Sequence, residues 1–216
     1  MKILFLGDSY SVNHEGWPSR VANILNAESV NHSRAASSLN YMFTKLDHAL
    51  KYEFYDIVIA TITSGDRMFH SDKIIHAGFP QYNDGTPITG KERKAIDLFY
   101  TYLWDSQNGC INEQIFQLAM TTISLLHPKT KFIFLPAFSE WKASSVGNYV
   151  YTHPRLIDIS FLDSESQRME AEGLPTTRLN HLTKKQNNDL ADQIITMINQ
   201  YNFNSATLYD LNLKNL

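Results

Sequence analysis

Short apolar runs that stop abruptly at polar turns mark the strands along this chain. Residues 3–6, 56–62 and 131–136 are dominated by apolar side chains, a pattern typical of strands buried on both faces of a parallel sheet. A shorter segment at residues 29–31 predicts a further strand between the first two. The tail is ambiguous, with a short edge strand expected around residues 206–209.

Between the apolar runs, apolar residues recur every three or four positions, which predicts amphipathic helices. The first begins near Pro18, a residue that favours the first turn of a helix. Others are expected at residues 39–50, 96–103 and 111–122, and a capping box at residues 183–186 starts the last one. Strands alternating with helices indicate an α/β fold, a three-layer αβα sandwich around a mostly parallel sheet of about five strands.

Two long segments do not fit this alternation. Residues 64–90 and 137–180 carry many glycines, prolines and aromatic residues and are too long for plain connections. We interpret them as loop insertions in a single domain that spans residues 1–216. The aromatic residues at the start of the second insertion suit either the lining of a sugar-binding cleft or ordinary packing: Phe138, Trp141 and Tyr149.

Composition narrows the class of protein. The chain has 216 residues, 43% of them hydrophobic, which suits one domain with a sizeable core. A net charge of −3 gives no reason to expect nucleic acid or a membrane as partner. No apolar stretch approaches the roughly 20 residues that span a bilayer, and no secretory signal precedes the first strand, so we expect a cytoplasmic location.

Metal and cofactor sites are not expected. The solitary Cys110 excludes a disulfide within the chain and suits a small buried apolar residue. His70 and His76 have neither the spacing nor the carboxylate partner of a known metal site. The first turn lacks the Gly-x-Gly-x-x-Gly pattern of dinucleotide-binding folds. We therefore predict no cofactor and no metal.

The chemistry is expected at the turn after the first strand, Gly7-Asp8-Ser9. Ligands of open α/β sheets bind outside the carboxyl ends of the strands. The Ser9 hydroxyl and backbone N–H would face this crevice. The alternative interpretation is an ordinary turn, since all three residues are common turn formers.

This arrangement resembles the SGNH (GDSL-type) hydrolase family over most of the chain. Phe5-Leu6-Gly7-Asp8-Ser9-Tyr10-Ser11 is similar to the nucleophile block of that family, and Asn180-His181-Leu182-Thr183 is similar to its closing block. The resemblance implies a flavodoxin-like topology, Ser9 as nucleophile and His181 as general base. Asp8 and Asn180 are further candidates for the site.

The two middle blocks match those of the family in position but not in residue type. Residues 31–36 put Ala36 where a glycine of the oxyanion hole is usual, and its backbone N–H can serve if its φ is negative. Residues 63–66 put Ser64 where an oxyanion asparagine is usual. The resemblance thus implies an oxyanion hole formed by Ser9, Ala36 and Ser64. Arg67 is a second candidate donor, or half of a local ion pair with Asp66.

The closing block departs from the family at Arg178, which stands where an aspartate normally orients the histidine. Either a serine–histidine dyad operates, with the imidazole held by a backbone carbonyl, or another acid replaces the aspartate. Four acids are near in sequence: Asp158, Asp163, Glu170 and Glu172.

The expected function is a serine hydrolase that acts through an acyl-enzyme on a small acyl ester, such as an acetyl group on a carbohydrate or another small alcohol. Two alternatives remain open at this point. One is an O-acyltransferase that uses the same site. The other is a binding or assembly protein that keeps the fold and has lost the chemistry, which the departures at Ala36, Ser64 and Arg178 favour. The acyl group, the alcohol and the oligomeric state cannot be predicted from the sequence.

Overall fold

We describe the fold from a computed structural model of the chain. The structure describes these residues: 1–12, 14–63, 65, 67–70, 73–75, 80–82, 86–104, 111–112, 115–116, 118–120, 122–123, 126–136 and 182–200.

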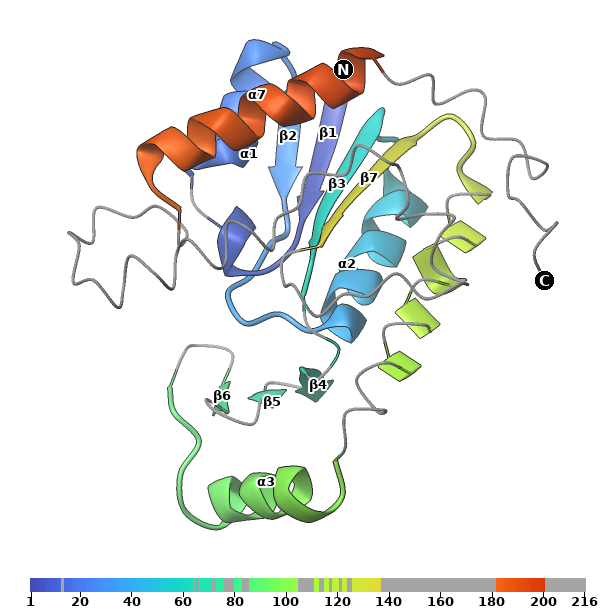
Figure 1. Cartoon of the computed structure of the whole chain (residues 1–216). Helices are drawn as coiled ribbons and strands as arrows, with labels where there is room; N and C mark the ends of the chain where they lie inside the picture. Colours follow the sequence, from blue (N-terminus) through green and yellow to red (C-terminus); the bar gives the residue numbers. More distant parts are fainter. Residues whose placement is uncertain are drawn as a thin grey trace, which may run out of the picture.

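A four-stranded parallel sheet forms the centre of the described residues (Figure 1). Its strand order is β2-β1-β3-β7, and all three pairings are parallel. The strands are β1 (Lys2–Leu6), β2 (Glu28–Asn31), β3 (Ile57–Ile62) and β7 (Lys131–Pro136). The carboxyl ends of these strands therefore meet at one edge of the sheet.

Helices cover both faces of this sheet. Helices α1 (Trp17–Ile24) and α7 (Lys184–Gln200) lie on one face, and α2 (Leu39–Tyr52) lies on the other (Figure 1). The described residues between positions 111 and 126 add helical turns on the α2 face. The three-layer αβα sandwich predicted from the sequence is therefore confirmed.

Alternate side chains of the central strands enter two separate cores. Ile3 and Phe5 belong to the core beneath α1 and α7, whereas Leu4 and Leu6 belong to the core beneath α2. All four side chains are at most 1% exposed. Such two-sided burial explains why β1 reads as an uninterrupted apolar run rather than as an alternating pattern.

A small subdomain follows β3 at the carboxyl edge of the sheet (Figure 1). It contains an antiparallel sheet of β4 (Met68–His70), β5 (Lys73–Ile75) and β6 (Gln81–Tyr82), followed by α3 (Gly90–Tyr102). Polar contacts join its parts, including a 2.7 Å hydrogen bond that the Tyr82 hydroxyl donates to Glu92. None of the residues of α3 is buried.

The structure refines several expectations from the sequence. The parallel sheet has four strands in the described residues rather than about five. Part of the segment that we interpreted as a loop, residues 64–90, forms β4, β5 and β6. The segments 137–180 and 206–209, His76 and Cys110 lie outside the described residues. In the described part of the chain, no helix is both long enough and apolar enough to cross a membrane.

Candidate active site

The residues that follow β1 form a tight helical turn at the carboxyl edge of the sheet. Asp8 caps this turn, η1 (Ser9–Ser11): its carboxylate accepts a 3.1 Å hydrogen bond from the Tyr10 backbone N–H. The Asp8 carbonyl accepts a second bond from the Ser11 N–H, at 3.0 Å. Ser9 is half-buried and occupies the first position of the turn. Its backbone is thus fixed on both sides.

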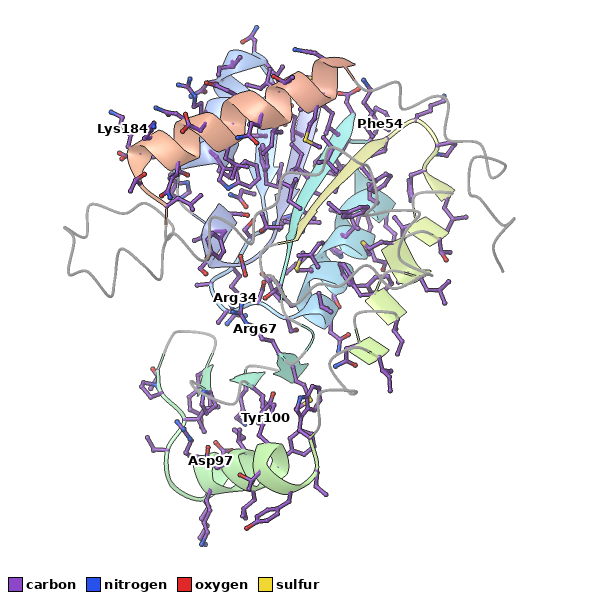
Figure 2. All side chains as sticks on the ribbon, in the orientation of Figure 1. Arg34, Phe54, Arg67, Asp97, Tyr100 and Lys184 are labelled. Carbon is purple, nitrogen blue, oxygen red and sulfur yellow. The ribbon has the colours of Figure 1, made fainter. Side chains whose placement is uncertain are left out.

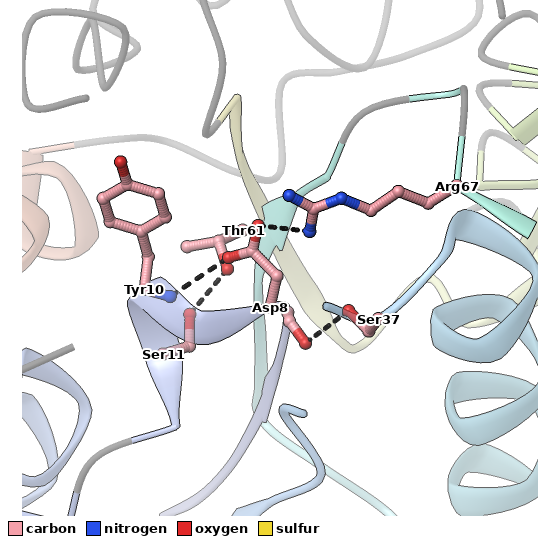
Figure 3. A network of polar contacts seen from close by, with 7 residues as sticks. Asp8, Tyr10, Ser11, Ser37, Thr61 and Arg67 are labelled. Carbon is pink, nitrogen blue, oxygen red and sulfur yellow. Dashed lines mark hydrogen bonds and ion pairs between the residues drawn. The ribbon is translucent and has the colours of Figure 1, made fainter. Parts of the chain in front are cut away.

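Gly7 permits a close approach between this turn and β3. A Cβ atom built on Gly7 would lie 1.8 Å from Thr61 Oγ1 and 2.8 Å from Ser11 Oγ. The Thr61 and Ser11 hydroxyls are hydrogen-bonded to each other at 2.6 Å (Figure 3). Gly7 also has a φ of +152°, in a region that side chains disfavour. Both the space and the backbone conformation therefore require glycine.

The loop that follows β2 is hydrogen-bonded to the same turn. The Gly7 carbonyl accepts a bond from the Arg34 N–H at 2.9 Å. It accepts a second bond from Ser37 Oγ at 2.8 Å, which is drawn in Figure 3. The Asn31 side chain donates to the Ser11 carbonyl at 2.7 Å and accepts from the Ser33 N–H at 2.8 Å. The second sequence block therefore lies beside Ser9, as its position in the fold requires.

Ala36 does not have the backbone conformation on which its role as an oxyanion donor is conditional. Its φ is +56°, not negative. The cause is a β-turn over residues 34–37, closed by a 3.0 Å bond from the Ser37 N–H to the Arg34 carbonyl. With Ala36 as its third residue, this is a type II turn, in which that residue must have a positive φ and is usually glycine or asparagine. An alanine in this conformation costs about 1–2 kcal/mol.

Arg67 brings the loop after β3 to the turn. Arg67 lies at the edge of the sheet that faces the small subdomain (Figure 2), and its Nη1 is 3.4 Å from Asp8 Oδ2 (Figure 3). The Asp8 side chain is 0% exposed and that of Arg67 is 14% exposed. Asp66, the other acid expected to pair with Arg67, lies outside the described residues, as does Ser64. Between them, Gly65 accepts a 2.9 Å bond from the Asn112 side chain.

The start of α7 is anchored beside the same turn. Thr183 and Gln186 form the predicted capping box, with reciprocal bonds of 2.8 and 3.2 Å. Asn187 accepts a 2.8 Å bond from the Trp17 N–H, and its amide donates to the Leu182 carbonyl at 3.3 Å. Asn187 is only 2% exposed. These contacts hold the beginning of α7 against α1.

Leu182 belongs to the same core cluster as Tyr10, and both are almost fully buried. They are the neighbours in sequence of His181 and Ser9. The structure therefore places Leu182 of the closing block in the core that supports η1. His181, Asn180 and Arg178 lie outside the described residues, as do the four candidate acids Asp158, Asp163, Glu170 and Glu172.

One titratable group near the second block has a shifted pKa. Burial lowers the pKa of the His32 imidazole, and the positive charges of Lys45 and His48 on α2 lower it further, while Glu53 opposes this shift. His32 is therefore biased toward its neutral form. Among the described residues, no three His, Cys, Asp or Glu side chains gather as a metal site would require.

The sequence analysis missed several residues that shape the site. Thr61 and Asn187 are polar residues at core positions, Thr61 in a strand that is buried throughout and Asn187 on the inner side of α7. A polar residue within an otherwise apolar pattern is the signal that could have identified both. Ser37 and Asn31 lack such a signal, because polar residues are ordinary both in the loop of Ser37 and in the largely exposed strand that ends at Asn31.

Comparison with known proteins gives matches at the level of structure only. A scan against models of protein families finds no match, and neither does a search of curated proteins. The crystal structure of the acetyl xylan esterase AlAXEase matches with a TM-score of 0.50 and 13% identity, over 92% of this chain and 100% of that one.

Two other esterase structures give similar values. EstA, a psychrotrophic esterase from Pseudoalteromonas sp., has a TM-score of 0.49 at 14% identity and covers 92% of this chain and 97% of its own. A catalytic mutant of Axe2, an acetylxylan esterase from Geobacillus stearothermophilus, has a TM-score of 0.49 at 11% identity and covers 94% of this chain and 95% of its own. At these identities the likeness concerns the fold, and the parallel sheet with its flanking helices agrees with it. The chain thus shares its α/β fold, a parallel sheet between layers of helices, with the AlAXEase structure.

Proposed function

We propose that this protein is a serine esterase that hydrolyses a small acyl ester, with Ser9 as nucleophile and His181 as general base. One observation carries the proposal. Ser9 begins a rigid turn at the carboxyl edge of the parallel sheet, and the loops after β2 and β3 both bond to that turn. Ligands of open α/β sheets bind at this edge, so the serine lies where a substrate would bind.

The chemistry follows from the residue types. Ser9 Oγ attacks the ester carbonyl carbon as its proton passes to His181, because a serine hydroxyl is a weak nucleophile without a base. The carbonyl oxygen becomes an oxyanion, and its collapse breaks the bond to the alcohol, which leaves with the proton from His181. Water then attacks the acyl-enzyme in the same way and releases the acid. The Ser9 backbone N–H and the Ser64 hydroxyl are the proposed oxyanion donors. Ala36 is left out of this set, because its φ of +56° does not meet the condition on which its role depended.

The anchoring of α7 supports His181 as the base. Leu182, the next residue, lies in the core that also contains Tyr10, the residue after Ser9. The capping box and Asn187 hold this end of the chain in place. An imidazole ordinarily has a pKa near 6.5, which suits proton transfer near neutral pH.

An acetyl ester on a carbohydrate is the proposed substrate class. The name of AlAXEase, which shares the fold, describes an enzyme that acts on acetyl xylan. An O-acyltransferase would use the same acyl-enzyme with an alcohol in place of water. A binding protein without catalysis is the remaining alternative, and Arg178, in place of the usual acid, is the residue that favours it.

The test is turnover of p-nitrophenyl acetate by the wild type, Ser9→Ala and His181→Ala, with Ser29→Ala, an exposed serine of β2, as matched control. We expect activity in the wild type and in Ser29→Ala, and a loss of about 10³-fold or more in the two site variants. Trapping with a fluorophosphonate and mass spectrometry should locate the covalent adduct on Ser9. Unchanged activity in Ser9→Ala, or an adduct elsewhere, would refute the assignment. Absence of activity and of any adduct in the wild type would favour the binding protein.

A further inference from the structure

The carboxylate of Asp8 is an unusual neighbour for a nucleophile. It is 0% exposed, and a charge without contact with water needs compensation from the protein. One oxygen accepts the Tyr10 N–H and the other lies 3.4 Å from Arg67 Nη1. Figure 3 shows the guanidinium reaching this carboxylate from the loop after β3.

The charge of Asp8 opposes the reaction proposed for Ser9. The oxyanion would form beside the Ser9 N–H, one residue from Asp8, and two negative charges repel more strongly in a site of low dielectric constant than in water. The described contacts of Asp8 explain why an acid is nevertheless useful, because its carboxylate caps the turn that holds Ser9. The positive charge of Arg67 offsets the repulsion without removing the cap.

We propose that Arg67 is a positioning residue that acts through Asp8, neutralising this carboxylate and fixing the turn, rather than a direct donor to the oxyanion. The inference rests on the proposed function, since it concerns the oxyanion formed at Ser9. Asp8 and Arg67 then have a joint task that neither residue performs alone. Asp8 fixes the geometry of the turn, and Arg67 makes that geometry compatible with a developing negative charge.

The decisive comparison is Asp8→Asn against the double variant Asp8→Asn, Arg67→Met. Once Asp8 is neutral, Arg67 has no charge to offset there, so adding Arg67→Met should lower kcat for p-nitrophenyl acetate by less than about 3-fold. A direct oxyanion donor would instead cost about 10²–10³-fold in either background. A loss of that size in the double variant, relative to Asp8→Asn, would overturn the proposal.

The single variants supply a second readout. Arg67→Met should lower kcat by about 10²-fold with little change in KM, and Arg67→Lys, which keeps the charge, should recover most of that loss. The double variant Asp8→Asn, Arg67→Met should have a kcat at least about 10-fold higher than that of Arg67→Met alone. Failure of both Arg67→Lys and the double variant to recover activity would refute the proposal.

Circular dichroism and urea unfolding should accompany these rates, because Arg67→Met removes the positive charge beside the buried Asp8 carboxylate and can prevent folding. The comparison within the Asp8→Asn background does not depend on that variant. Arg20→Met is the matched control: Arg20 forms an exposed pair with Asp192, at 3.1 Å, that joins α1 to α7, and its loss should leave kcat unchanged. A wild type without esterase activity would overturn the proposed function and this inference together, whereas an active wild type isolates the role of Arg67.

Discussion

Gly7→Ala tests how tightly the turn at Ser9 is built. The new Cβ would lie 1.8 Å from Thr61 Oγ1, a distance that two such atoms cannot maintain, so the turn or β3 must move. Forcing an extra methyl group into a packed core costs about 1–3 kcal/mol. A side chain at a φ of +152° adds about 1–3 kcal/mol. Together these effects predict a loss of about 2–6 kcal/mol, a large fraction of the roughly 5–15 kcal/mol that holds a domain folded.

Urea unfolding separates the cost of the clash with Thr61 from the cost of the backbone conformation at residue 7. Thr61→Ala removes the clashing oxygen but also the 2.6 Å bond to Ser11, and alone should cost about 1 kcal/mol. The double variant Gly7→Ala, Thr61→Ala should lose about 1–3 kcal/mol less than the sum of the single losses. The cost of placing a side chain at a φ of +152° should persist in this double variant. Gly90→Ala is the matched control, because Gly90 has a φ of +63° and its new Cβ would meet no atom within 4 Å, and it should cost only about 1 kcal/mol.

Additive losses in the double variant would refute the clash with Thr61. A Gly7→Ala variant as stable as Gly90→Ala would refute the whole explanation, including the claim that the turn is rigid. Activity provides a further check: Gly7→Ala should lower kcat more than Gly90→Ala does, since only Gly7 adjoins the turn that carries Ser9.

Three further measurements test other parts of the structure. Ala36→Gly should raise the free energy of unfolding by up to about 1 kcal/mol, because glycine adopts the observed positive φ freely; a less stable variant would contradict the type II turn. The lowered pKa of His32 means that, below about pH 6.5, the unfolded chain binds a proton that the folded chain resists, so stability falls as the pH drops. As the pH falls from about 8 to about 5.5, the free energy of unfolding of His32→Gln should therefore rise relative to that of the wild type. A difference between the two proteins that does not vary with pH would refute this. Asn187→Ala should destabilise by about 2–4 kcal/mol, because it leaves the buried Trp17 N–H without its acceptor, whereas the half-buried neighbour Asn188→Ala should change little.

Much of the fold could be predicted because it depends on patterns that lie along the chain. The strands at residues 3–6, 57–62 and 131–136 carry runs dominated by apolar side chains, as the burial of a central parallel sheet on both faces requires. The start of α7 was predictable from the Thr183 and Gln186 capping box, which is a local signal. Strands β4 to β6 could not be predicted, because strands of two or three residues carry too little pattern.

The site was predictable only in part. A turn residue after a buried strand and a family resemblance located Ser9, but neither indicates which residues bond to the turn. Arg67 pairs with Asp8 across 59 positions, and Ala36 adopts a positive φ because its turn demands it rather than because alanine favours it. Such features depend on tertiary contacts and on turn geometry, which single residues do not reveal.

The contacts around Ser9 also have a consequence for how the protein folds. The bond between Ser11 and Thr61 joins residues 50 positions apart, and the bond between Trp17 and Asn187 joins residues 170 positions apart. Helices form within microseconds from local contacts, whereas contacts between distant residues must await the closure of long loops. The bond between Ser11 and Thr61 thus forms only once β3 has met β1, and the bond between Trp17 and Asn187 only once α7 has met α1. A chain that is still being synthesised therefore carries Ser9 without the complete set of contacts around it.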